Sequence, residues 1–382
     1  MRDSGRTDTL LFGAVILICL FGLIMVYTSS VIWAIRGGHS ETFFLRSQIG
    51  KFALGMVLLF PLSRLPYRVL GGPVARWSLA AAYLGMILTL TPWFSSTFNG
   101  TRRGLFGIQP AEFARIFLVL FLAYYAQKTE SATRPVPGRA RDWRSLLVPL
   151  GATLGLALLA KMQPNLSMAV MIAALGVGVL FASGQSILRL GAALLPVCLI
   201  VLAALKPYQL ARIRGFQEHF LGNRGDGSSN LHWQVEQSLI ALGSGGALGK
   251  GIGQGLQKFC YLPYSFSDFI LGMVGEETGF LGVFILFTLF AIVLVRGFRI
   301  ARRCPDTFGQ VLAIGLTLNL ALNFFLHSIV GLGLGPVTGV PLPFVSHGGS
   351  SLLANLVAIG LLLSISRSVR PEAEVRETAW SR

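Results

Sequence analysis

Acidic residues are scarce in this chain: Asp and Glu make up 16 of its 382 residues, against 32 Lys and Arg. Cysteine is scarce too, and the four present show neither metal-ligand nor disulfide spacing, so we interpret them as packing residues. The histidines lack ligand spacing, and no Ser/His/Asp arrangement is recognisable. The sequence therefore excludes a disulfide scaffold and a protein-only metal centre, and it leaves few acids as candidate catalytic groups.

Hydrophobic residues, by contrast, make up 53% of the chain, and the mean hydropathy is +0.66. Several apolar runs are long enough to cross a bilayer, which predicts an all-α, polytopic integral membrane protein with about ten spans. We expect one membrane domain over residues 1–382, whose first helix stays as an uncleaved signal anchor. The expected spans lie near 10–35, 47–62, 77–93, 108–126, 145–161, 166–183, 188–205, 267–295, 307–330 and 344–366.

The net charge of +16 could indicate nucleic-acid binding, but its distribution argues against that. Basic residues gather in the short loops on one side of the ten-span arrangement, which predicts that this side is cytoplasmic. Both termini then lie in the cytoplasm, in a multi-pass membrane protein that binds no nucleic acid. The basic clusters lie within 64–76, 128–144 and 296–303 and in a tail, 367–382.

One long segment, 206–266, falls on the outer side between the seventh and eighth spans, and loops of this length are usually functional. Within it, 231–240 has a helical period with one apolar face, which is typical of a helix in the membrane interface. The run 242–255 is rich in glycine. The glycines could allow close backbone approach to another segment, cradle a phosphate with backbone N–H groups, or form a plain flexible turn.

Asp268 stands where this outer segment meets an apolar run, and Glu276 and Glu277 follow two turns later. Ionised groups near hydrocarbon are costly, so acids kept there are functional-site candidates. The alternative is that Asp268 caps the following helix, because Asp is a favoured N-cap residue. The position by itself is compatible with both.

Further polar groups converge on the same side. Arg102 and Arg103 run against the positive-inside bias, and arginine binds two phosphate oxygens at once, although both could simply face water. Glu112 and Arg115 lie one helical turn apart and could equally form a mutual ion pair. The remaining candidate substrate-binding residues are Lys161, Lys250 and Lys258, together with Ser346 and Ser350.

The two serines belong to 333–351, a run of glycines and prolines between the last two spans. Non-helical backbone at membrane depth is tolerated only where protein or a wet cavity satisfies it. We therefore interpret this run as a re-entrant loop lining the same cavity, with an ordinary outer loop as the alternative.

Basic groups for phosphate, one carboxylate as a base and a surrounding membrane together suit an enzyme acting on a lipid pyrophosphate. A divalent cation, Mg²⁺ or Mn²⁺, is expected to help neutralise the leaving group. The alternative is a transporter that flips a lipid-linked precursor, which needs phosphate-binding charge but no base at Asp268. Internal symmetry would favour the transporter, and none is evident.

The motifs carrying these residues resemble those of the SEDS family, the FtsW/RodA/SpoVE group of peptidoglycan polymerases, over nearly the whole chain. They are Asn99-Gly-x-Arg-Arg, Gln109-Pro-x-Glu-Phe-Ala, Gln163-Pro, Ser244-Gly-Gly, Asp268-Phe-Ile, Gly275-Glu-Glu and Pro341-Leu-Pro-Phe-Val-Ser-x-Gly-Gly-Ser-Ser.

The resemblance implies ten transmembrane helices and a glycosyltransferase that polymerises lipid II, an undecaprenyl-pyrophosphate-linked substrate, outside the cytoplasmic membrane during division or elongation. It implies a complex with a class B penicillin-binding protein and other divisome or elongasome proteins. It also makes Asp268 the catalytic residue. Residues 256–263 look more like FtsW than RodA.

Four positions depart from the family pattern. Phe266-Ser267 stands where His-Thr is usual, Asn165 where Asp is usual, His347 where Tyr is usual and Arg115 where Lys is usual. Arg115 keeps the charge and Asn165 loses one. These changes bear on the roles of those side chains and leave Asp268 intact.

Overall fold

The computed structural model describes residues 7–91, 93–98, 101–132, 143–203, 210, 216, 230–259, 262 and 265–369. Most of the basic cluster 128–144, nearly half of the outer segment 206–266 and most of the tail 367–382 lie outside these residues, as do the side chains of Arg102 and Cys198. Cys19 and Cys304 are both free thiols, in agreement with their interpretation as packing residues.

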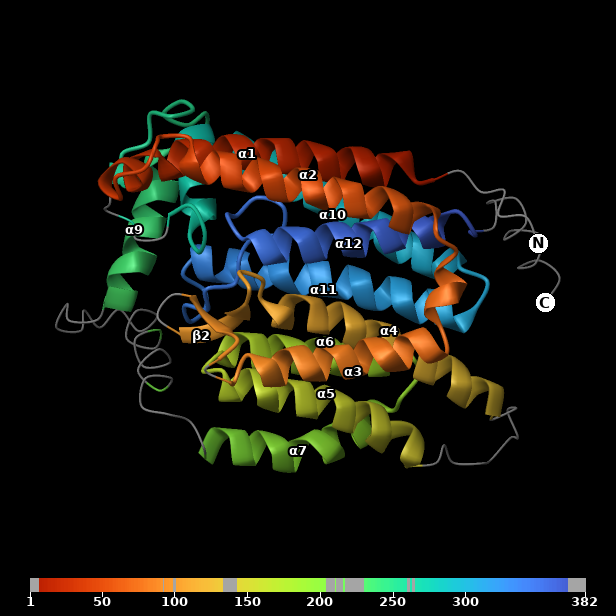
Figure 1. Cartoon of the computed structure of the whole chain (residues 1–382). Helices are drawn as coiled ribbons and strands as arrows, with labels where there is room; N and C mark the ends of the chain where they lie inside the picture. The colour runs from red at the N-terminus through yellow and green to blue at the C-terminus, as the bar shows by residue number, and fades with distance from the viewer. Residues whose placement is uncertain are drawn as a thin grey trace.

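Each expected span overlaps one long helix (Figure 1). Among the described residues, six helices are long and apolar enough to cross a membrane, and the count of ten spans stays a prediction. The ten helices are α1 (Thr9–Arg36), α2 (Phe43–Arg64), α3 (Pro73–Leu88), α4 (Pro110–Ala132), α5 (Arg144–Met162), α6 (Leu166–Ala182), α7 (Ile187–Ala203), α10 (Ile270–Arg303), α11 (Thr307–Gly331) and α12 (Gly349–Ser366).

Within the described ranges, two 3-10 helices and one further α-helix lie between these ten helices. The 3-10 helices η1 (Tyr67–Leu70) and η2 (Gln257–Phe259) lie in connections. The predicted amphipathic helix of the outer segment is confirmed as α9 (Asn230–Ser244), which lies crosswise at one end of the bundle (Figure 1).

Helix α12 occupies the centre of the bundle, and nearly all of its residues are buried. Its sequence is apolar on every face, so it offers no polar stripe to solvent and packs on all sides. It packs against α2, α11 and α4 and also touches α1 and α10, whereas α6, α3 and α5 lie beyond α4 (Figure 1).

A β-hairpin, which sequence reasoning missed, precedes α4. Strands β1 (Ser95–Phe98) and β2 (Thr101–Leu105) pair antiparallel, with an irregularity between Ser96 and Thr97. The dipeptide Asn99-Gly100 between them is a strong hairpin signature and could have predicted it. The hairpin places Arg102 and Arg103 on a short strand beside the membrane helices.

The loop between α11 and α12 inserts into the bundle. A Cβ added at Gly22 would lie 2.5 Å from the Phe344 carbonyl oxygen, so only glycine allows this backbone contact. Gly22 lies midway along α1, roughly 21 Å from the end of the helix at Arg36, at 1.5 Å per residue. Such depth supports the interpretation of 333–351 as re-entrant.

The glycine-rich run is held against a break in α10. Gly279 has non-helical backbone angles there (φ 67°, ψ −168°) and interrupts the helix. The amide of Lys250 donates to the Glu276 carbonyl at 2.9 Å, and the amide of Gly251 donates to the Glu277 carbonyl at 3.1 Å. A Cβ at Gly249 would lie 2.3 Å from the Glu277 carbonyl oxygen, so the glycines serve close backbone approach to α10.

The carboxylates of Glu276 and Glu277 are fully buried and bind this same run. Glu276 accepts hydrogen bonds from the Leu256 and Gln257 amides at 2.8 and 3.1 Å, and from Lys250 Nζ at 2.8 Å. Glu277 accepts one from the Gly253 amide at 2.9 Å. These amides are satisfied by the protein itself, so the run needs no phosphate to order it.

We therefore expect Glu276→Gln to destabilise the protein by about 2 kcal/mol or more, because a buried charge-assisted network loses its charge. Thermal unfolding in detergent measures this effect, with Glu41→Gln, an exposed glutamate, as the matched control. Equal melting temperatures for the two variants would show that the network contributes nothing.

Candidate active site

A cavity of about 370 Å³ lies at the end of the bundle that carries the re-entrant loop. Six segments line it: α2, the hairpin with its following turn, the start of α4, the start of α6, the stretch before α10, and the loop 338–341 with the first turn of α12. The polar and charged lining residues are Lys51, Arg103, Gln109, Glu112, Asn165, Ser167, Ser267, Asp268, Thr338, His347, Ser350 and Ser351.

Asp268 lies half-buried in this lining, two residues before helix α10. The N-cap of that helix is Phe269, without a side-chain cap hydrogen bond, so Asp268 is not the N-cap residue. Its Oδ2 faces the loop at Gly339, where an added Cβ would lie 3.3 Å away. The carboxylate thus stands at the wall of a polar cavity.

The segment that carries Asp268 is tied to the re-entrant loop. Ser346 Oγ donates to the Ser267 carbonyl at 2.6 Å and accepts from the Leu342 amide at 2.9 Å. The His347 amide donates to the Phe266 carbonyl at 2.9 Å. Ser346 is buried behind the cavity lining, where it positions the residues next to Asp268.

Two departures from the family pattern, Phe266 and His347, contact one another. Their ring centroids lie 5.7 Å apart, and Phe44 packs against both, at 4.8 Å from Phe266 and 5.3 Å from His347. The two replacements therefore form one aromatic wall of the cavity, and Asp268 lies beside it.

Glu112 and Arg115 form a buried ion pair, as their spacing allowed. Glu112 lines the cavity, whereas Arg115 lies fully buried behind it and donates to Asn323 Oδ1 at 2.8 Å. Breaking such a pair leaves an uncompensated charge, so both residues hold α4 against α11. Asn165, another departure, caps α6 by accepting from the Met168 amide at 3.3 Å.

Lys51 on α2 is the charged lining residue that sequence reasoning missed. It is half-buried, and no hydrogen bond or ion pair from its ammonium group is found among the described residues. A Cβ added at Gly349 would lie 2.8 Å from Lys51 Nζ, which places the ammonium beside the first turn of α12. A lysine inside an apolar run is itself a functional-site indication, and this signal within the expected span 47–62 could have identified it.

The ammonium group of Lys51 lies beside the N-terminus of α12. The N-terminus of α12 carries a partial positive charge and has no side-chain cap hydrogen bond. An ammonium group beside it adds a like charge, and Lys51 forms no ion pair within the described part of the chain. An anion bound between them would relieve both, so this corner of the cavity is suited to phosphate.

Two other candidates also line the cavity. Arg103 lies half-buried, and one of its terminal nitrogens donates to the Pro164 carbonyl at 2.6 Å, which joins the hairpin to the start of α6. Ser350 Oγ accepts from the Gln109 amide at 2.8 Å and joins α12 to the start of α4. For Arg102 the described structure gives only the backbone, paired with Thr97 in the hairpin.

The three lysines that the sequence offered as substrate-binding candidates lie outside this lining. Lys161 is in the last turn of α5. Lys250 pairs with Glu276 at 2.8 Å, and Lys258 lies 3.9 Å from Glu277 and donates to the Gly253 carbonyl. The structure therefore gathers Asp268, Arg103, Glu112 and Ser350 around one cavity and leaves these lysines apart from it.

Comparison with known proteins identifies the family to which the sequence is similar. The family model of cell cycle proteins FtsW, RodA and SpoVE matches residues 8–371. The chain is 34% identical to a probable peptidoglycan glycosyltransferase FtsW of Trichlorobacter lovleyi, over 95% of the chain and 94% of that protein. It is also 34% identical to stage V sporulation protein E of Bacillus subtilis, over 95% and 98%.

Solved structures agree with the sequence relatives. A chain of a peptidoglycan synthase complex, described as coordinating polymerization and crosslinking, superposes with a TM-score of 0.75 at 28% identity, covering 95% of this chain and 98% of that one. The rod shape determining protein RodA of Thermus thermophilus superposes with a TM-score of 0.67 at 26% identity, covering 96% and 99%.

Proposed function

The chain belongs to the FtsW/RodA/SpoVE family, and on this premise we propose that it is a peptidoglycan glycosyltransferase that polymerises lipid II at its Asp268 cavity. The observation that carries this proposal is the cavity itself. It combines the carboxylate of Asp268 with the cations of Lys51 and Arg103 and the first turn of α12. Glu112, the other carboxylate of the lining, is engaged by Arg115.

In the proposed reaction, Asp268 acts as the general base. It accepts the proton of the acceptor sugar's 4-hydroxyl as that oxygen attacks the anomeric carbon of the donor, with inversion. The new bond joins this oxygen to the anomeric carbon, and the bond from that carbon to the lipid pyrophosphate breaks. Lys51 and Arg103 stabilise the negative charge on the departing pyrophosphate, the role also assigned by sequence to the arginine pair.

A divalent cation fits this site in one way. Among the described residues, no group of three His, Cys, Asp or Glu could hold a metal ion. Mg²⁺ or Mn²⁺ would therefore be held chiefly by pyrophosphate oxygens and water, which leaves the Asp268 carboxylate available as the base. Bound there, the ion would neutralise the leaving group.

The cavity and the end of α12 lie at opposite ends of the bundle. Helix α12 begins in the cavity at Gly349 and, with 18 residues, spans about 27 Å. At its other end Ser366 Oγ accepts from the Asp8 amide, so the described beginning and end of the chain lie together. We infer that this basic end of the multi-pass protein lies on the cytoplasmic side and that the Asp268 cavity faces the outside.

The test is polymerisation of lipid II by the purified protein with Mg²⁺ or Mn²⁺, followed by gel separation of the glycan products. We expect chains of many disaccharides from the protein alone or with its partner. Transfer of labelled lipid II across vesicle membranes without any glycan product would instead support the flippase alternative.

The partner we propose is a class B penicillin-binding protein, since the similar chain in the solved complex works where polymerization and crosslinking are coordinated. Co-expression with the class B proteins of the source organism should give a complex that survives detergent extraction and gel filtration. A tagged single-span membrane protein of unrelated function is the control. If no class B protein co-elutes, the partner assignment is wrong.

A further inference from the structure

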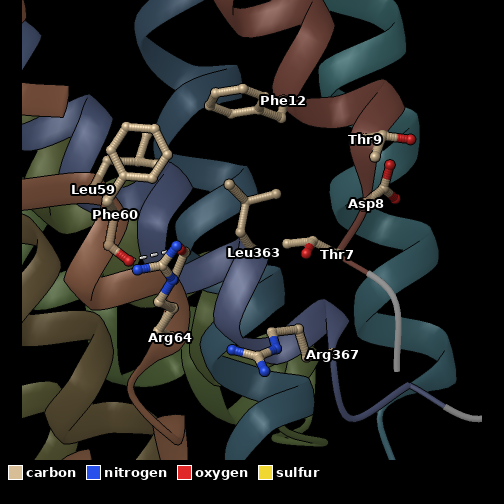
Figure 2. A pocket seen from close by; sticks show the side chains of 10 residues that line it. Thr7, Asp8, Thr9, Phe12, Leu59, Phe60, Arg64, Leu363 and Arg367 are labelled. Carbon is tan, nitrogen blue, oxygen red and sulfur yellow. Dashed lines mark hydrogen bonds between the residues drawn. The ribbon is translucent and has the colours of Figure 1, made fainter. Parts of the chain in front are cut away.

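A second cavity, of about 750 Å³, lies at the end of the bundle remote from Asp268, among the start of α1 and the ends of α2 and α12 (Figure 2). It shares no lining residue with the Asp268 cavity. Neither the sequence motifs nor the proposed reaction assigns it a role.

The charged groups of this cavity leave an excess of positive charge. Asp8 is neutralised by Arg296, whose Nε and a terminal nitrogen lie 2.8 and 2.7 Å from Asp8 Oδ2. Its Oδ1 caps α1 by accepting from the Leu11 amide at 3.0 Å. Arg64 and Arg367 have no ion pair or side-chain hydrogen bond within the described part of the chain, and Figure 2 shows both at the same end of the cavity.

The rest of the cavity is mostly apolar. Phe12, Leu59, Phe60 and Leu363 form its wall, with the rings of Phe12 and Phe60 centred 6.3 Å apart (Figure 2). Leu59 is buried, but Phe60 is 47% exposed. The wall therefore continues onto the outer face of α2, where Val57 is also exposed and where a membrane helix meets lipid chains.

A ligand matching both parts is an amphiphile with an anionic head. A soluble anion would contact the arginines and leave the aromatic wall uncovered, whereas a neutral lipid would leave two cations without a counter-charge. Basic pockets between membrane helices on the cytoplasmic side are known to suit the head groups of anionic lipids. Arginine also binds phosphate oxygens in pairs.

We propose that this cavity binds one anionic phospholipid of the inner leaflet, with its phosphate between Arg64 and Arg367 and an acyl chain along Phe12 and Phe60. The assignment to the inner leaflet depends on the membrane orientation proposed above, whereas the binding of an anionic phospholipid does not. The lipid would join α1, α2 and α12 at the end opposite the active site.

Native mass spectrometry of the detergent-purified protein, titrated with dioleoylphosphatidylglycerol and with dioleoylphosphatidylcholine, tests the proposal. We expect the wild-type protein to retain phosphatidylglycerol preferentially, and the double variant Arg64→Gln/Arg367→Gln to bind it about tenfold more weakly or worse. The matched control is Arg299→Gln/Arg302→Gln, which removes two exposed arginines of α10 and the same charge. This control should bind within about twofold of wild type.

Three results would overturn the proposal. One is equal phosphatidylglycerol affinity in the double variant and the control. The others concern the wild-type protein and stand even where the double variant fails to fold: equal retention of the two lipids, or displacement of phosphatidylglycerol by inorganic phosphate at the same concentration. None of the three bears on lipid II polymerisation, so the failure of this proposal is distinguishable from that of the function proposed above.

Discussion

Asp268→Asn is expected to polymerise lipid II roughly 100-fold to 10,000-fold more slowly than wild type, the contribution usual for a general base. The amide keeps the shape of the carboxylate but cannot accept the proton of the attacking hydroxyl. The measurement is the initial rate of glycan synthesis at equal amounts of folded protein, with thermal melting to verify folding.

Asp306→Asn is the matched control. Asp306 caps α11 at the other end of the bundle by accepting from the Gly309 amide at 3.0 Å, and Asn caps a helix about as well as Asp. We expect this control to polymerise within about twofold of wild type. Near-wild-type synthesis by Asp268→Asn would reject its role as the base.

Lys51→Gln is expected to lower kcat/KM for lipid II by about tenfold to a hundredfold, since one charge-assisted contact to pyrophosphate contributes roughly 1.5–3 kcal/mol. The stability of the folded protein should not fall with the activity. Because Lys51 has no anionic partner among the described residues and lies beside a helix N-terminus, its removal should leave the melting temperature unchanged or raise it.

Two further variants separate this role from general charge loss. Lys51→Arg retains a cation and should recover much of the activity. Lys128→Gln removes an exposed lysine of α4 at the far end of the bundle and should leave kcat/KM unchanged. A loss of stability in Lys51→Gln together with an unchanged kcat/KM would assign Lys51 to the fold instead.

The helices of the fold could be predicted because each span is a property of its own segment. Apolar runs predicted the positions of α1, α11 and the others, and the apolar period of 231–240 predicted α9. The hairpin before α4 was missed although Asn99-Gly100 indicates it locally. The break at Gly279 does not interrupt the hydropathy pattern and depends on the glycine-rich run that packs alongside, which the sequence of α10 alone does not reveal.

The residues of the site could likewise be predicted from the sequence only in part. Asp268, Arg103, Glu112 and Ser350 were found from charge, position and motif, and the structure brings them to one cavity. Lys250 carries the same charge as Lys51, but it pairs with Glu276, which lies 26 residues away in the sequence. Such a pairing decides whether a lysine is available to a ligand, and sequence patterns alone do not reveal it.

The central claim is that Asp268 accelerates the reaction of bound lipid II and does not contribute to lipid II binding. Measuring both binding and synthesis for Asp268→Asn tests this claim most directly. One preparation is assayed for the dissociation constant of lipid II and for glycan synthesis, both against wild type. We predict a dissociation constant within about threefold of wild type, since the amide removes no contact to pyrophosphate, together with the loss of polymerisation stated above. Glycan synthesis at the wild-type rate, or a loss of binding as large as the loss of synthesis, would contradict the account.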